Sequence, residues 1–175
     1  MKGCYCLIIK LDKNSTIRIG KKLGKIEFKK GYYVYVGSAM NSLEARIKRH
    51  LSDEKKLHWH IDYFLKESEI EKVICNVSPK KVECELSQFI ASRTCGIESF
   101  GCSDCDCESH LYYFESKNQA VQTVKDAYDS LAIDFRIINP WNNDWPAFQL
   151  YRPAVPYEIH HKTQDWVHIS YWNFF

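Results

Sequence analysis

The feature that most constrains this chain is an unbroken run of strand-forming residues, residues 31–37, with the sequence GYYVYVG. Aromatic and β-branched side chains favour a strand that packs inside a sheet, and a glycine stands at each end of the run. A second apolar run, residues 3–9, also consists mostly of strand formers. The core is therefore expected to form around a sheet that contains both runs.

Residue periodicities place further strands and helices around these two runs. Strands are predicted at 16–19, 71–77 and 111–114, and residues 133–138 are strand-like. Helices are predicted at 42–51, where Ser42 suits the N-cap, and at 61–65, 82–93 and 118–131. Residues 20–30 are basic and interrupted by glycine, and no element is assigned to them. The order of elements predicts an α+β fold, a small antiparallel sheet flanked by helices.

The composition changes near residue 115. Residues 116–175 hold twelve of the chain's 25 aromatic residues, four of its five tryptophans and four of its five prolines. We therefore expect a domain at 1–115 and an aromatic-rich C-terminal extension at 116–175. Because no linker separates them, the extension is expected to pack on the domain, and an intermolecular contact is the alternative. The apolar residues at issue are Trp141, Trp145, Trp166, Trp172, Phe174 and Phe175.

The formal net charge of +2 conceals two halves of opposite sign. Residues 1–60 carry fourteen Lys and Arg against five Asp and Glu, and residues 61–175 carry ten against seventeen. A basic N-terminal part suits a polyanion such as nucleic acid, and a solvated lysine-rich face is the alternative. No apolar run approaches the roughly 20 residues that span a bilayer. The sequence therefore predicts a cytoplasmic protein with no membrane association.

Several motifs occur in a fixed order along residues 3–115. Tyr5 after Gly3-Cys4, the triplet Tyr35-Val36-Gly37, and Arg46 resemble the ordered elements of the GIY-YIG nuclease superfamily. The chain is similar, more closely, to an archaeal and bacterial family of GIY-YIG-like domains of unknown function, DUF123. Members of that family sometimes occur fused to a DNA-repair glycosylase. The motifs that carry this likeness are residues 31–39, 46–50, 58–63, 83–85 and 100–111.

The resemblance implies a metal-dependent phosphodiesterase. Tyr5 would act as general base toward an attacking water, and Tyr35 would orient the phosphate or share that role. Arg46 would donate to the scissile phosphate, since its fork matches phosphate oxygens, and His50, one turn later, would assist proton transfer. A helical glutamate, Glu83 or Glu85, would bind Mg²⁺ or Mn²⁺. Without the resemblance, Tyr5 and Tyr35 would be interpreted as packing residues.

Further side chains are candidates for contact with the nucleic acid because they lie in or beside these motifs. They are Lys30, Ser38, Lys48, Arg49, His58 and His60. For His58 and His60, which flank Trp59, a structural role is the alternative. The sequence departs from most nucleases of the superfamily in two respects. The Asn that follows their Glu has no counterpart here, and the first triplet, Gly3-Cys4-Tyr5, keeps the Tyr but not the Ile.

A second constellation, Cys102, Cys105, Cys107 and His110, lies within nine residues. Three thiolates and an imidazole are the donor set of a structural zinc site. The spacing of Cys105 and Cys107 is tight for one tetrahedral ion, so His58 or His60 could supply a ligand instead. Free thiols, or a redox or disulfide role for Cys105 and Cys107, are the other interpretations.

Three hypotheses for function follow. The first is a metal-dependent endonuclease that hydrolyses phosphodiester bonds in DNA, in a repair setting. The second is a catalytically inactive nucleic-acid-binding module that serves as partner to another repair enzyme. The third is a small zinc-stabilised interaction domain whose aromatic tail is the contact surface. The sequence predicts no oligomeric state.

Overall fold

The computed structural model describes residues 1–141, and it confirms the predicted α+β fold. A five-stranded antiparallel sheet has the order β6-β4-β1-β5-β7, and β2 and β3 form a separate two-stranded sheet. The strands are β1 (Gly3–Leu11), β2 (Ser15–Ile19), β3 (Gly24–Phe28), β4 (Gly31–Ala39), β5 (Glu69–Cys75), β6 (Leu111–Phe114) and β7 (Arg136–Ile138). The helices are α1 (Leu43–Leu51), α2 (His60–Phe64), α3 (Glu83–Ala91) and α4 (Lys117–Ser130).

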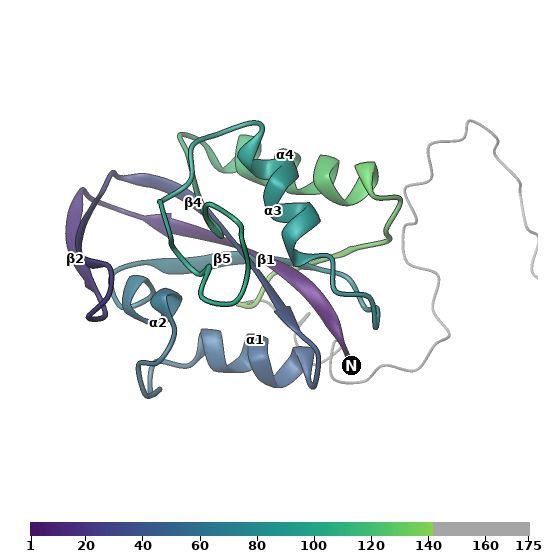
Figure 1. Cartoon of the computed structure of the whole chain (residues 1–175), viewed down its shortest axis with the longest axis horizontal. Coiled ribbons are helices and arrows are strands. Elements are labelled where there is room, and N and C mark those ends of the chain that lie inside the picture. The colour runs from purple at the N-terminus through teal and green to yellow at the C-terminus, as the bar shows by residue number, and fades with distance from the viewer. Residues whose placement is uncertain (142–175) are drawn as a thin grey trace, which may run out of the picture.

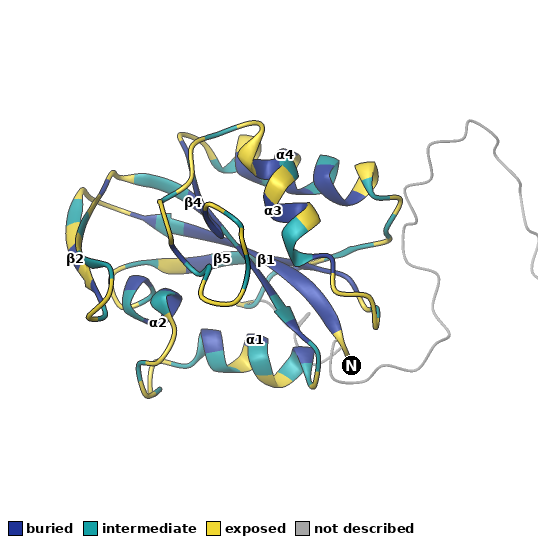
Figure 2. Cartoon of the chain, viewed as in Figure 1, coloured by how far each residue is buried: buried dark blue, intermediate teal, exposed yellow. Residues whose placement is uncertain are grey.

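β1 is the central strand, and both of its faces are buried. Because successive side chains of a strand point to opposite faces, Tyr5, Leu7 and Ile9 enter one core while Cys4, Cys6 and Ile8 enter another. α1 and α2 cover the first face, and α3 and α4 cover the second (Figure 1). Figure 2 shows β1 buried along nearly its whole length. The domain is therefore a sheet between two helical layers.

The predicted strands and helices all appear, with ends that differ by a few residues. The one omission is β3, which pairs with β2 as a hairpin (Ile17 opposite Ile26). Its alternation of Lys25, Ile26, Glu27 and Phe28 is a short half-exposed strand pattern, and the basic residues around it concealed the pattern.

The first part of the C-terminal extension belongs to the same layers as the domain. α4 packs through Val124 and Tyr128 on the second core, and β7 pairs with β5 at the edge of the sheet. The indole nitrogen of Trp141 donates to the carbonyl of Ile70 at 2.6 Å. The prediction for the other tail aromatics, from Trp145 onward, lies outside the described residues. Within residues 1–141, no helix is long and apolar enough to cross a membrane.

A partly buried ion pair joins α1 to α2. Arg49 of α1 makes two bonds, at 2.7 and 2.8 Å, to the carboxylate of Asp62, whose side chain is fully buried. The same carboxylate accepts from the backbone amides of His58 and Trp59. Burial raises the pKa of Asp62, but the hydrogen bonds from Arg49 and the two amides outweigh it and lower that pKa to about 2. This pair sets the position of α1, which carries Arg46 and His50.

We expect Arg49→Met to lower the free energy of unfolding by about 3 kcal/mol, because it leaves a buried carboxylate without its cation. Lys48→Met removes an exposed neighbouring charge and is expected to change stability by less than about 0.5 kcal/mol. Urea denaturation at neutral pH measures both. Equal stability of the two variants would show that the pair does not hold α1.

Candidate active site and candidate metal centre

The phenol of Tyr5 lies at the centre of the candidate active site. Tyr5 is 1% exposed, and its hydroxyl hydrogen-bonds Nε2 of His50 on α1 at 2.7 Å. Its ring lies over Gly37 of β4, where an added Cβ would approach the ring carbon and the hydroxyl oxygen to 2.6 Å. Only glycine leaves room for the phenol there. The glycine of the Tyr35-Val36-Gly37 triplet is thus explained by the tyrosine of the neighbouring strand.

Tyr35 and His50 complete an aromatic group around Tyr5. The ring centroids of Tyr5 and Tyr35 are 6.5 Å apart, those of Tyr5 and His50 5.4 Å, and those of Tyr35 and His50 6.1 Å. Tyr35 is half-buried, whereas Tyr5 and His50 are buried. Of the two phenols, Tyr35 is therefore the one with more access to solvent.

Arg46 lies one turn before His50 on α1. It is half-exposed, and its guanidinium lies over the ring of Trp59 at 5.1 Å from the centroid. Burial raises the pKa of both Tyr5 and Tyr35 well above the usual value, and the positive charge of Arg46 partly opposes this. The phenols are therefore protonated at neutral pH.

Glu83 approaches the phenols from the start of α3, on the other helical layer. Its Oε2 accepts from the Ser38 hydroxyl at 2.6 Å and lies 3.2 Å from Nζ of Lys81. Its Oε1 lies 3.9 Å from Nδ1 of His110. The negative charge of Glu83 contributes to the raised pKa of both Tyr5 and Tyr35. Glu85 is exposed.

His50 is held neutral by its surroundings. Burial lowers its pKa to about 3, and the positive charge of Lys55 adds to that effect. Its Nδ1 is buried and has no hydrogen-bond partner among the described residues. The imidazole therefore meets Tyr5 as an uncharged group that can accept or donate one hydrogen bond at Nε2.

The predicted nucleic-acid contacts fall into two groups. Lys30, Lys48 and His58 are exposed and remain open to solvent. The other three have partners within the protein. Arg49 binds Asp62, Ser38 donates to Glu83, and Nδ1 of His60 accepts from the Gly101 amide at 3.1 Å.

Four side chains form a cluster that could hold a metal ion. The ligand atoms of Cys84, Cys105, Cys107 and His110 all lie within 4.8 Å of one another. The Sγ of Cys105 and Nε2 of His110 are 3.1 Å apart. Cys84 comes from the first turn of α3, and the others come from the loop that leads into β6. The cluster therefore joins a helix and a loop.

This donor set differs from the predicted one by a single ligand. Cys102 is outside the cluster, and its thiol donates to the carbonyl of Phe100 within its own turn at 3.4 Å. Cys84 stands in its place, and neither His58 nor His60 belongs to the group. Sequence spacing gave no local signal for Cys84, because 21 residues separate it from Cys105. The sequence offered one indication, because Cys84 lies between Glu83 and Glu85, which are both candidate metal ligands.

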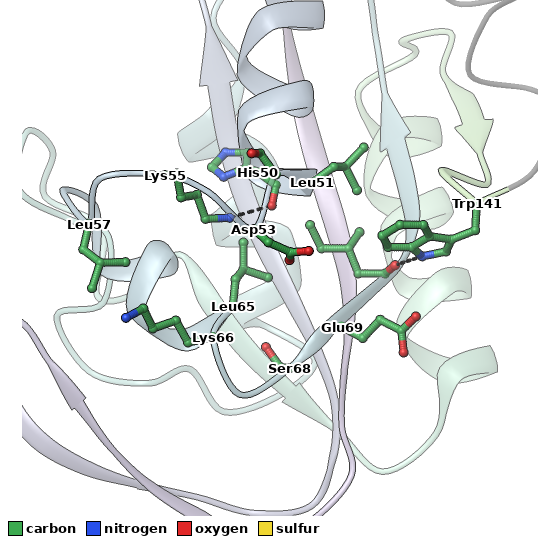
Figure 3. Close-up of a pocket in the computed structure, with 12 residues that line it drawn as sticks. His50, Leu51, Asp53, Lys55, Leu57, Leu65, Lys66, Ser68, Glu69 and Trp141 are labelled. Atoms are coloured by element: carbon green, nitrogen blue, oxygen red, sulfur yellow. Dashed lines mark hydrogen bonds between the residues drawn. The ribbon is translucent and has the colours of Figure 1, made fainter.

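A separate pocket of about 310 Å³ lies beside the C-terminal end of α1 (Figure 3). His50 lines it, and Lys55 closes one side by donating to the His50 carbonyl at 2.7 Å. Trp141 bounds it on the other side. Its charged lining residues are two lysines and two acids, and neither Tyr35, Arg46 nor Glu83 takes part. The pocket is therefore not the place where the candidate catalytic groups meet.

The fold and the cluster together define the class: an α+β domain with a buried tyrosine–histidine pair and a candidate Cys/His metal centre. The family model described as "Domain of unknown function DUF123" matches residues 4–133, and the chain belongs to that family. The match extends past residue 115 and includes α4. No curated protein and no solved structure matches the chain.

The depressed pKa of His50 predicts a pH-dependent stability. An unfolded histidine binds a proton below about pH 6.5, whereas folded His50 stays neutral down to about pH 3. The stability that His50 contributes by staying neutral is therefore fully present above pH 6.5 and is lost as the pH falls from there toward 3. Between pH 7 and pH 5, we expect His50 to account for a loss of about 2 kcal/mol.

Urea denaturation of the native protein and of His50→Gln at both pH values measures this contribution. The variant should lose about 2 kcal/mol less than the native protein over that interval. An identical loss in both proteins would mean that His50 is protonated in the folded state.

Proposed function

We propose that the chain is a metal-dependent phosphodiesterase of the GIY-YIG type that acts on DNA, in a repair setting and beside another repair enzyme. The single observation that supports the proposal is the hydrogen bond of Tyr5 to His50 beside Tyr35, with the charges of Arg46 and Glu83 acting on both phenols. These residues come from β1, β4, α1 and α3. A merely structural role would not require a guanidinium and a carboxylate to approach two phenols from opposite helical layers.

The burial of Tyr5 determines how it could act as a base. A free phenolate is unfavourable there, but the bond to Nε2 of His50 offers a proton relay. A water molecule would give its proton to the Tyr5 oxygen as the Tyr5 hydroxyl passes its own proton to His50. The negative charge of a bound phosphate would raise the pKa of His50 and so favour the transfer.

Arg46 and Glu83 supply the two charges that phosphoryl chemistry requires. The half-exposed guanidinium of Arg46 could donate two hydrogen bonds to a phosphate. Glu83 suits a cation such as Mg²⁺ or Mn²⁺, because Oε1 has no hydrogen-bond donor within 3.5 Å among the described residues. A bound metal would neutralise charge on the leaving oxygen. Mg²⁺ or Mn²⁺ at Glu83 and Zn²⁺ at the Cys/His cluster are the proposed cofactors.

The test is cleavage of a panel of branched, nicked and single-stranded DNA with Mg²⁺ or Mn²⁺. Tyr5→Phe, Arg46→Ala and Glu83→Gln are each expected to lower kcat by about 10²-fold or more, because each removes a proton acceptor or a charge from the transition state. The matched controls are Tyr32→Phe, Arg18→Ala and Glu85→Gln, which change the same residue types outside the candidate catalytic group. They should retain native rates.

Cleavage that survives Tyr5→Phe and Arg46→Ala would overturn the mechanism. Equal losses of kcat in a variant and in its matched control would overturn it as well.

A second function, nucleic-acid binding without catalysis, is favoured by one observation. Tyr5 is 1% exposed, so water reaches its hydroxyl only if the site opens. Trp59, 41% exposed and beneath Arg46, would then be a surface on which an unpaired base stacks. DNA binding by the native protein, with no cleavage in either metal, would establish this function in place of the nuclease.

A further inference from the structure

The structure points to a zinc centre that positions the carboxylate of Glu83. We propose that Cys84, Cys105, Cys107 and Nε2 of His110 bind one structural Zn²⁺ and that the ion orients Glu83 toward the two phenols. The metal would thus act on a residue that is not its ligand. The role of Glu83 in catalysis rests on the proposed function, whereas the metal centre and its link to Glu83 are argued from geometry.

The spacing of the four donors fits a tetrahedral ion. Zinc binds thiolates at about 2.3 Å and imidazole at about 2.0 Å, so ligand atoms around it stand about 3.5–3.8 Å apart. The four atoms here lie within 4.8 Å of one another, and the Cys105 sulfur lies 3.1 Å from Nε2 of His110. Small side-chain movements would therefore close the site. Thiolates select zinc over Mg²⁺ and Ca²⁺, which take oxygen ligands.

The imidazole of His110 connects the proposed ion to Glu83. Its Nε2 faces Cys105, and its Nδ1 is buried without a hydrogen-bond partner among the described residues. Oε1 of Glu83 lies 3.9 Å from this Nδ1, close enough for a small side-chain movement to bring the two into a hydrogen bond. Metal-bound histidines usually donate their second ring N–H to a carboxylate or carbonyl, which fixes the ring. Binding at Nε2 would place the proton on Nδ1 and draw Glu83 toward it.

The backbone makes a second connection. Glu83 and its neighbour Cys84 are the first residues of α3, and the N-cap Val82 makes no side-chain hydrogen bond. A metal bound to Cys84 would fix this otherwise uncapped turn, and with it the direction of Glu83. The loop side is anchored as well, since the His110 carbonyl accepts from Val36 of β4 and the Gly101 amide donates to His60. The ion would thus join α3, β4 and α2 around the phenols.

Metal content tests the ligand set. The full chain, purified and reconstituted with Zn²⁺, should hold about one ion per chain and release protons as its thiols bind. Cys84→Ser should lose the ion or bind it at least tenfold more weakly. Cys102→Ser is the matched control, since this thiol lies in the same loop outside the cluster, and it should bind zinc like the native protein.

Three results would overturn the ligand set. They are zinc retained by Cys84→Ser and lost by Cys102→Ser, no binding by the native protein after reduction and reconstitution, and a disulfide among Cys84, Cys105 and Cys107.

The link to Glu83 is tested without any cleavage assay. In the Co²⁺-substituted protein, thiolate-to-cobalt charge-transfer bands and visible bands report the ligand field. Glu83→Ala should weaken metal affinity about 10–100-fold and shift these bands, because His110 loses its acceptor. Glu85→Ala, one residue beyond Cys84 and exposed, should leave both unchanged. Equal effects of the two variants, or none in Glu83→Ala, would refute the link even if the protein proves to be a nuclease.

The consequence for catalysis is a separate measurement. If Glu83 acts on the substrate, loss of zinc through Cys84→Ser should lower kcat for cleavage more than it changes KM, and raised Mg²⁺ or Mn²⁺ should not restore it. A native protein that binds zinc but cleaves no DNA would refute the proposed function and would still support the zinc centre.

Discussion

The rest of the structure depends on the burial of β1 on both faces. A central strand that is buried on both faces from Gly3 to Ile9 needs a helical layer on each side, and α1 with α2 and α3 with α4 provide them. The same alternation sends Tyr5 toward α1 and Cys4 toward α3. The candidate catalytic groups on α1 and the candidate metal ligand on α3 therefore lie in different layers, and some other feature has to bring them together.

That feature is the C-terminal end of β4, which extends beyond the end of its neighbour β6. β6 pairs with β4 only as far as Tyr35, opposite Leu111, and Val36 still donates to the His110 carbonyl. From Gly37 to Ala39, β4 pairs with β1 alone among the described residues. Ser38 lies on this open stretch, and its hydroxyl holds Glu83 there. Because β6 stops, the start of α3 can approach the phenols from the side of the sheet. The loop before β6 occupies the same space and carries three of the four candidate metal ligands.

The fold could be predicted from the sequence because strong local patterns govern it. The aromatic run of β4, the stripe of Leu43 and Ile47 and the Ser42 cap all act within a few residues, and Ser42 does accept from the Ala45 amide at 3.2 Å. The candidate site could be predicted only in part. Cys84 is far from the other metal ligands in the chain, and Ser38 is far from Glu83, so no short sequence spacing indicates either connection. Likewise, the engagement of Arg49 by Asp62 depends on where α2 packs, which no periodicity encodes.

The contact between Tyr5 and Gly37 has a consequence for how the protein folds. β1 and β4 pair with Tyr5 opposite Gly37, and both neighbours of that glycine, Val36 and Ser38, carry side chains. A chain that paired these strands one residue out of register would place a Cβ beneath the phenol and expel the ring from the core. The hydrogen bond to His50 would then be lost as well. Correct strand pairing and assembly of the tyrosine–histidine pair are thus a single event, so a misaligned intermediate cannot carry the site.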